Sequence, residues 1–442
     1  MPRRKRKPVP TQPVRAEVEA LTHDGRGVAH IEGKATFIDG ALPGEEVMFT
    51  YTLQRKHYDE GVIRGVLRAS PDRVAPACPH FGMCGGCSLQ HLSADAQIRT
   101  KAGQLQDNLQ RIGRLAPESW LPPLTGPHWG YRRKARLGVK YVIKKSSLLV
   151  GFREKKSAYL AELKRCDVLH PKVGANIMAL RELIGGLDGY ARIPQIEVAA
   201  GDDTVGLVFR HLDPLSEADL GRLHAFGETH GFLIYLQPGG PGTVRPLWPL
   251  NASLSYRLPA HEIEFEFLPT DFTQVNGDLN RAMIDHALGL LAPHPEDHVL
   301  DFFCGLGNFT LPLARRTAQV IGVEGDAALV ARARDNARRN GIDNAVFHAA
   351  DLSEPDAPWP WAERRFDKIL LDPPRTGALE VVKRLAALGA ERIVYVSCNP
   401  ATFARDAAGL VHGHGYRLAR AGVMDMFPHT THVECIALFL RD

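Results

Sequence analysis

Residues 298–314, HVLDFFCGLGNFTLPLA, decide the fold of the C-terminal part of this chain. A short apolar run leads into a glycine-containing turn, and a helix-like run follows the turn. Gly305 and Gly307 allow the backbone to come close to a ligand, and the first turn of the helix offers free N–H groups. Thr310 stands where a dinucleotide fingerprint has its third glycine, so the sequence disfavours pyrophosphate binding.

Short apolar runs recur after this stretch, and helical patterns separate the first four of them. The runs are HVLDFF at 298–303, QVIGVEG at 319–325, AVFHAAD at 345–351, FDKILLD at 366–372 and ERIVYVS at 391–397. The segment 326–341 has apolar residues at helical spacing and ends in Asn-Gly. This alternation predicts a doubly wound parallel sheet, a Rossmann-like α/β domain over residues 266–442. The segments 415–427 and 432–442 are expected to finish the sheet as a hairpin.

Acidic residues end the first two of these strands. Asp301 lies in the first run, and Glu324 closes the second about twenty residues later, where an acid suits the hydroxyls of a ribose. Asp-x-x-x-Gly-x-Gly followed by such an acid is the arrangement of S-adenosylmethionine-dependent methyltransferases. The sequence therefore predicts S-adenosylmethionine as the methyl donor.

Cys398 ends the run IVYVSC directly before Asn-Pro, and Asp372 ends the neighbouring run. Ligands of open α/β sheets bind at the carboxyl ends of the strands, which favours a catalytic role over the usual role of a buried cysteine as a small apolar side chain. A thiolate that adds to C6 of a pyrimidine makes C5 nucleophilic toward a methyl donor, and a general base must then remove the C5 proton. Glu434 interrupts an apolar strand and is the candidate base, with a paired structural carboxylate as the alternative.

The N-terminal part of the chain has a different texture. Short β-like runs broken by Gly, Pro and Asp occupy residues 11–70, which predicts a small all-β barrel in a domain of residues 1–72. Residues 73–265 form the expected mixed central domain, in which Ser93 is placed as the N-cap of a helix.

Positive charge is concentrated in one segment of this central domain. Residues 131–165 contain twelve Lys and Arg but two Glu, whereas the whole chain has a net charge of +4. Such a concentration is typical of a nucleic-acid-binding surface, with a solvated sheet face as the alternative. The basic run at 3–7 supports no further conclusion.

The composition limits the remaining classes. The chain has 442 residues, 44% of them apolar and 24% charged, as in ordinary globular proteins of two or three domains. No run of eighteen apolar residues predicts a transmembrane helix, and no apolar segment follows the basic N-terminus as in a signal peptide. An odd count of seven cysteines argues against an extracellular disulfide framework and for the cytoplasm.

Three cysteines lie within the ten residues 78–87, CPHFGMCGGC. Three thiols are one more than a single disulfide uses and one fewer than the four ligands of a tetrahedral metal site. Four thiolates bind either zinc or iron, and the spacing does not decide between these metals.

The motifs LDPPRTG, VSCNP and HTTHVE, in this order behind DFFCGLGNF, resemble those of the RNA uracil-C5 methyltransferases. The segment LTHDGRGVAHIEGKATFIDGALPGEEV resembles the TRAM domain, an RNA-binding barrel of the OB type. YRRKAR in the basic segment resembles the region of this family that faces RNA, so the resemblance covers the whole chain.

The resemblance implies roles for twelve residues. It implies Cys398 as the nucleophile and Glu434 as the base. Contacts with S-adenosylmethionine are implied for Gln274, Phe303, Asn308, Glu324, Asp351 and Asp372. A [4Fe-4S] cluster is implied on Cys78, Cys84, Cys87 and, where the family has a fourth cysteine, Cys166.

The resemblance also implies a partner. Family members that act on tRNA are expected to lack both barrel and cluster, and one ribosomal branch has the cluster without the barrel. A chain with both resembles the branch that methylates a uridine of 23S ribosomal RNA. Nothing in the sequence indicates more than a monomer.

Other functions stay open at this point. Another ribosomal RNA or tRNA pyrimidine is one alternative, although cytosine-C5 enzymes typically have two cysteines in Thr-Cys and Pro-Cys motifs. Radical enzymes usually space their cluster ligands C-x₃-C-x₂-C, whereas five residues fill the first gap here. A non-catalytic iron–sulfur RNA-binding protein explains the barrel and the basic segment, but not the acids and the cysteine of the sheet.

Overall fold

The computed structural model describes residues 9–251, 253–354 and 358–441, so the basic run at 3–7 lies outside the described residues. The chain divides into two compact units. The first contains the residues up to Lys101 together with Pro428–Thr431, and the second contains Ala102–Phe427 and His432–Asp442. The division into three domains drawn from the sequence stays a prediction.

The first unit begins with the expected small β structure. Its strands are β1 (Val14–Glu17), β2 (Ala20–Leu21), β3 (Gly27–Ile31), β4 (Lys34–Asp39), β5 (Glu46–Gln54) and β6 (Tyr58–Arg68), in the order β1-β5-β6-β4-β3-β2. Alternate residues face a core that includes Ile38, Val47 and Phe49. Gly61 of β6 lies so close to Phe49 that a Cβ atom would come within 2.4 Å of the ring, so only glycine fits there.

The cysteine loop and a helix follow the barrel in the chain. Helix α1 (Ala94–Asn108) begins as predicted after Ser93, whose hydroxyl accepts a hydrogen bond from the Ala96 N–H at 3.4 Å. The short segment Pro428–Thr431 belongs to the same unit, because the Ser88 and Leu89 N–H groups both donate to the His429 carbonyl at 2.9 Å.

The second unit contains two large sheets. The first sheet has the order β13-β12-β11-β10-β8-β9 and is mostly antiparallel. Its strands are β8 (Lys134–Val142), β9 (Ser147–Gly151), β10 (Gln195–Ala200), β11 (Val205–Arg210), β12 (Leu233–Gln237) and β13 (Arg245–Trp248), and its helices are α2 (Pro171–Gly174), α3 (Ile177–Gly185) and α4 (Glu217–His230). A separate hairpin of β14 (Leu254–Leu258) and β15 (Ile263–Phe267) leads to the second sheet.

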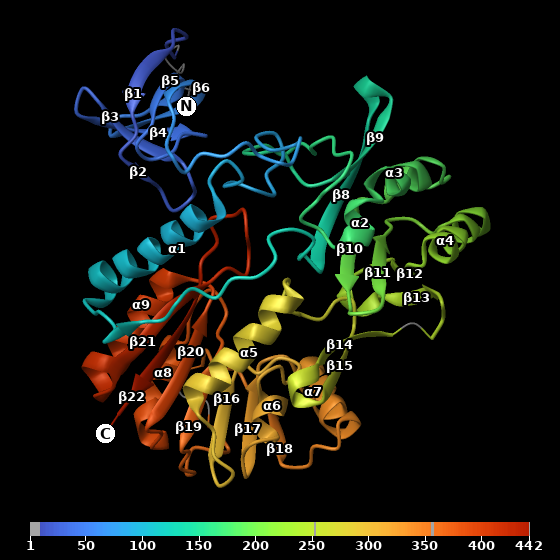
Figure 1. Cartoon of the computed structure of the whole chain (residues 1–442). Coiled ribbons are helices and arrows are strands. Elements are labelled where there is room, and N and C mark those ends of the chain that lie inside the picture. The colour runs from blue at the N-terminus through green and yellow to red at the C-terminus, as the bar shows by residue number, and fades with distance from the viewer. Residues whose placement is uncertain (1–8, 252, 355–357, 442) are drawn as a thin grey trace, which may run out of the picture. The chain divides into compact units, whose positions relative to one another are not determined.

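The second sheet is the predicted doubly wound one, with the order β18-β17-β16-β19-β20-β22-β21-β7 (Figure 1). Its strands are β16 (His298–Phe302), β17 (Gln319–Glu324), β18 (Ala345–Ala349), β19 (Lys368–Leu371), β20 (Arg392–Ser397), β21 (Arg417–Met424), β22 (Glu434–Leu440) and β7 (Ser119–Trp120). Its helices are α5 (Gly277–Leu291), α6 (Thr310–Ala314), α7 (Ala327–Arg339), α8 (Leu379–Leu385) and α9 (Pro400–Ala408). The first five strands are parallel, and β21 and β22 form the expected hairpin, with β22 antiparallel to β20.

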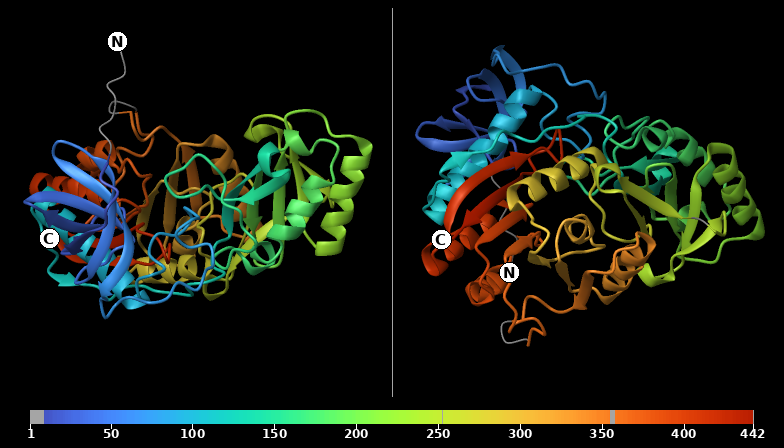
Figure 2. Two further views of the ribbon diagram at one scale, coloured as in Figure 1. Left: turned by 90° about the horizontal axis from the view of Figure 1, so that it is seen from above. Right: turned by 60° about the horizontal axis from the view of Figure 1, so that its bottom comes forward.

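Helices cover both faces of this sheet, which explains its continuous apolar strands. Val394 and Val396 of β20 join the same buried cluster as Met283 of α5. Tyr395 points to the opposite face, where its ring meets the ring of Phe403 in α9 at 5.4 Å. Figure 2 shows the same sheet and helices from two further directions.

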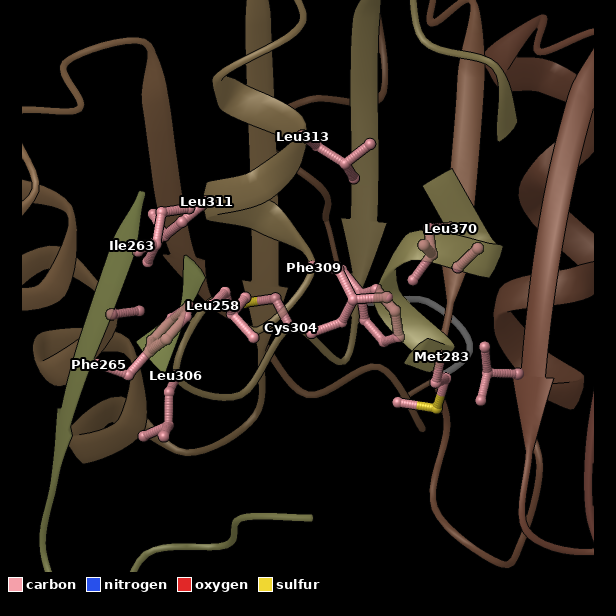
Figure 3. Packing of buried hydrophobic residues seen from close by; sticks show 14 of the residues in the cluster. Leu258, Ile263, Phe265, Met283, Cys304, Leu306, Phe309, Leu311, Leu313 and Leu370 are labelled. Atoms are coloured by element: carbon pink, nitrogen blue, oxygen red, sulfur yellow. The ribbon is translucent and has the colours of Figure 1, made fainter. Parts of the chain in front are cut away.

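The glycine turn after β16 rests on this core. Leu306 and Leu311, in the turn and in α6, are buried against the β14–β15 hairpin, from which Ile263 and Phe265 project (Figure 3). This packing holds the glycine turn against the β14–β15 hairpin. Among the described helices, none is long and apolar enough to cross a membrane.

Candidate active site

The glycine turn has the backbone conformation of a ligand cradle. Phe303, Gly305 and Gly307 all have positive φ, at 64°, 54° and 91°, and for a phenylalanine this is a strained conformation. The Glu324 carboxylate holds the turn by accepting the Gly305 N–H at 3.1 Å and the Gly325 N–H at 2.7 Å. Two of the residues expected to contact the methyl donor, Phe303 and Glu324, therefore shape one turn.

Asn308 is fixed by two neighbours that sequence reasoning missed. Its side-chain oxygen accepts hydrogen bonds from the Tyr256 hydroxyl at 2.9 Å and from the Asn280 amide at 3.2 Å. Tyr256 and Asn280 also line a small cavity with Gln274, which connects two of the expected contact residues. Tyr256 comes from the β14–β15 hairpin, and no pattern in the sequence marks this long-range contact.

Asp301 and Asp372 place two carboxyl groups at the carboxyl edge of the sheet. Asp301 is fully buried, and its Oδ2 accepts the Thr310 hydroxyl at 2.5 Å while Oδ1 has no partner among the described residues. Burial, with the charge of Glu324 in addition, raises the pKa of Asp301 to about 7. Burial and the charges of Glu434 and Asp301 raise the pKa of Asp372 to about 8.

Cys398 and Glu434 meet because of strand register. Ser397, the last residue of β20, pairs with Cys435 of β22, and Cys398 follows Ser397 while Glu434 precedes Cys435. Opposed residues of an antiparallel pair project to the same face. Burial and the charges of Glu434 and Asp372 raise the pKa of the Cys398 thiol to about 11, and Arg375 acts in the opposite direction.

His432 completes this group, and sequence reasoning did not select it. Ligand-capable atoms of Cys398, His432 and Glu434 all lie within 4.8 Å of one another, and His432 Nε2 is 3.3 Å from Glu434 Oε1. The imidazole also packs edge-on against the Phe427 ring at 4.4 Å. The spacing of two residues in HTTHVE was the signal, because positions i and i+2 of an extended segment share one face. The group is compact enough for a metal ion, but a metal-bound thiolate is not free to attack a base.

The remaining predicted residues lie elsewhere. Asp351 follows β18 in an exposed turn, where its carboxylate accepts the Ser353 N–H at 2.8 Å. Cys78, Cys84 and Cys87 are partly exposed thiols on the loop of the first unit, and Cys166 is a partly exposed thiol of the second.

The basic segment is only partly a solvated face. Arg136 pairs with Glu197, and Lys134 donates to backbone carbonyls while burial lowers its pKa to about 8. Lys140, Lys144, Arg153 and Lys156 are exposed and form no ion pair within the described part of the chain. These four cations are exposed positive charge in the described part of the segment.

Comparison with known proteins agrees with this geometry. Residues 253–354 and 361–442 match the family described as tRNA (Uracil-5-)-methyltransferase, and residues 10–48 match the TRAM domain. A crystal structure of Pyrococcus abyssi tRNA (uracil-54, C5)-methyltransferase in complex with S-adenosyl-L-homocysteine superposes with a TM-score of 0.74, at 26% identity over 97% of this chain and 100% of that one. The fold and site define an S-adenosylmethionine-dependent methyltransferase.

Full-length relatives define the family. The 23S rRNA (uracil(1939)-C(5))-methyltransferase RlmD of Alcanivorax borkumensis is 56% identical over 438 residues, which cover 99% of this chain and 98% of the relative. The protein of the same name from Nitrosococcus oceani is 57% identical over 439 residues, covering 98% of each. The chain belongs to the family of RNA uracil-C5 methyltransferases.

One expectation drawn from the resemblance is wrong. Family members that act on tRNA were expected to lack the barrel, yet the Pyrococcus enzyme, named for a tRNA base, matches 97% of this chain. The barrel is too large to fall in the uncovered remainder, so its presence does not separate ribosomal from transfer RNA enzymes.

The buried carboxyl of Asp301 predicts a pH dependence of stability. Its pKa is raised above the unfolded value near 4, so the folded state binds more protons between about pH 4 and pH 7 and stability falls as the pH rises through this window. We expect the melting temperature of D301N to decline less over this range than that of the wild type. The exposed Asp343, changed to Asn, is the control, and equal slopes for D301N and wild type would contradict the assignment.

The four free cations predict a salt dependence. On single-stranded RNA, the slope of log affinity against log salt becomes shallower by about 0.7 for each phosphate that the protein ceases to neutralise. We expect the variant with Lys140, Lys144, Arg153 and Lys156 changed to Ala to bind RNA with a shallower slope. The double variant R136A/E197A removes a neutral pair and should keep the wild-type slope. An unchanged slope in the quadruple variant would remove the segment from the RNA-binding surface.

Proposed function

We propose that this protein methylates C5 of uridine 1939 in 23S ribosomal RNA, the base in the names of its full-length relatives. The observation that carries the chemistry is the register that places Cys398 beside Glu434 at the carboxyl edge of the sheet. A thiol facing a carboxylate at the ligand-binding edge suits covalent activation of a pyrimidine.

In this mechanism Cys398 and Glu434 have separate duties. The Cys398 sulfur attacks C6 of uracil, and the electrons of the C5–C6 double bond move to form an enolate. C5 then attacks the methyl group that S-adenosylmethionine would supply, and the sulfonium S–CH3 bond would break to leave S-adenosylhomocysteine. Glu434 removes the C5 proton, the double bond re-forms, and the C6–S bond breaks to release Cys398. Both faces of the ring must be reached, so the base is flipped out of its stack.

The methyl donor has a matching set of residues. We assign its contacts to Gln274, Phe303, Asn308, Glu324, Asp351 and Asp372. The positive φ angles of the turn suit a backbone that a ligand approaches closely, and Glu324 ends β17, where an acid suits ribose hydroxyls. The charge of Glu434 contributes to the raised pKa of Asp372, so this carboxyl lies within electrostatic range of the proposed base.

A [4Fe-4S] cluster fits the donor chemistry of four cysteines. Cys78, Cys84, Cys87 and Cys166 are all thiols outside any disulfide, and the Gly86 N–H donates to the Cys84 sulfur at 3.4 Å, as amides do toward cluster thiolates. Four protein ligands leave no iron open, which favours a structural role for the cluster. With TRAM barrel and basic strands, it belongs to the RNA-binding part of a monomeric cytoplasmic enzyme.

The reaction is tested with labelled S-adenosylmethionine and two substrates, a 23S ribosomal RNA fragment containing uridine 1939 and tRNA. Methyl transfer to the fragment is expected, with the label mapped to this uridine. Transfer to tRNA instead would assign the chain the substrate in the name of its Pyrococcus relative. Equal labelling of cytidine would refute uracil specificity.

The covalent mechanism predicts opposite results for two variants. C398A should lose methyl transfer by at least about 100-fold and still bind S-adenosylmethionine, because the thiol contacts the base. E434Q should accumulate a protein–RNA adduct that migrates slowly on a denaturing gel, since the C5 proton cannot leave. Methyl transfer by C398A that is reduced by clearly less than about 100-fold, or no adduct in E434Q, would contradict these roles.

The cluster predicts a specific metal content. Anaerobically purified protein should absorb visible light and contain about four irons per chain, and C166S should lose both. C304A removes a buried thiol of the glycine turn and should keep the iron. A colourless protein with stoichiometric zinc would replace iron by zinc at this site.

A further inference from the structure

The proposed reaction must handle two protons at one site. The Cys398 thiol loses a proton before its sulfur attacks C6, and C5 loses a proton after the methyl group arrives. The Glu434 carboxylate holds one proton at a time. If it took the thiol proton, it would be a neutral acid when the C5 proton has to leave. A second proton acceptor close to Cys398 would keep Glu434 ionised for the removal of the C5 proton.

His432 is placed to be this acceptor. Its ring and the Cys398 sulfur are members of the group whose atoms lie within 4.8 Å, and the one other member within the described residues is Glu434. The side chain of His432 is 19% exposed and that of Glu434 is 10% exposed, so bulk water has limited access to both. Phe427 packs against the imidazole ring and restricts its rotation.

The charges around the thiol explain why an acceptor is needed. Cys398 follows β20, Glu434 begins β22, and Asp372 and Arg375 follow β19. Glu434 and Asp372 disfavour a thiolate, and Arg375 favours it. A lone thiolate between two carboxylates is costly, whereas a thiolate beside an imidazolium is compensated within the site.

We propose that His432 is a further acid–base residue of this site, which takes the proton of Cys398 as the sulfur attacks and returns it when the sulfur leaves. This inference rests on the proposed function for its place in turnover. Its claim about the reactivity of the thiol stands without RNA or S-adenosylmethionine.

The steps balance. The S–H proton moves to the imidazole, the sulfur electron pair forms the S–C6 bond, and the uracil double bond becomes the enolate. After methyl transfer Glu434 takes the C5 proton, the C5–H electrons restore the double bond, and the C6–S bond pair returns to sulfur. The imidazolium then gives its proton back to Cys398, and the C5 proton on Glu434 passes to solvent.

The test follows alkylation of Cys398 by iodoacetamide in the RNA-free holoenzyme, measured by peptide mass spectrometry from about pH 6 to about pH 11.5, which includes the thiol pKa of about 11. A thiol beside a proton acceptor reacts below the pH at which the thiol ionises by itself, so we expect wild-type alkylation to rise in two steps, the first of them below the ionisation of the thiol. H432N should lack the first rise and react at least about tenfold more slowly near pH 7.5, with the difference disappearing at high pH. H414N is the matched control. His414 lies just before Arg417, the first residue of β21, which pairs with Leu440 at the opposite end of the β21–β22 hairpin from Glu434.

Other results would overturn the proposal. Equal profiles for H432N and wild type would show that His432 does not act on the thiol. A loss of alkylation by the same factor at every pH would mean that the substitution only blocks access or disturbs packing. Recovery of the first rise in H432G on addition of free imidazole would support proton transfer, and no recovery together with normal folding would oppose it.

Turnover separates this role from that of Glu434. We expect the double variant H432N/E434Q to form the RNA adduct about 100-fold more slowly than E434Q and to reach the same final yield. An adduct that forms equally fast in both would refute the acceptor role. If the wild type methylates no RNA but keeps the two-step alkylation profile, the proposed function fails while the Cys398–His432 couple stands.

Discussion

The pairing of β22 with β20 is the constraint on which the active site depends. A parallel sheet brings the carboxyl ends of its strands to one edge. Each parallel strand contributes to this edge only the residues at its own carboxyl end. The antiparallel β22 enters this edge from the opposite direction. Its first residue, Glu434, therefore stands opposite Cys398, and the register that fixes Ser397 against Cys435 also fixes the spacing of the two reacting groups.

The same edge of the sheet carries several acidic side chains. The charges of Glu434 and Asp372 raise the pKa of the partly buried Cys398 thiol, and those of Glu434 and Asp301 raise the pKa of Asp372. Such an arrangement is unfavourable for stability and suits a site that must hold and release protons. The Glu324 carboxylate accepts hydrogen bonds from the Gly305 N–H of the glycine turn and from the N–H groups of Gly325 and Asp326.

The segment Pro428–Thr431 connects the two units through the covalent chain. It belongs to the first unit, where the His429 N–H donates to Gln97 at 2.8 Å and its carbonyl accepts from the residues that follow Cys87. His432 and Glu434 come directly after it.

The sequence by itself determined the elements and the chemistry of their ends. Alternating apolar runs and helical patterns predict the doubly wound sheet, and Asp301, Glu324, Asp372 and Cys398 are found at strand ends because strand boundaries are local properties. The tertiary structure decided which of these groups meet. His432, Tyr256 and Asn280 escaped sequence reasoning since their roles arise from strand register and from contacts between distant segments, which no local pattern encodes. Likewise, the neutralisation of Arg136 and the burial of Lys134 depend on neighbours supplied by other strands and loops.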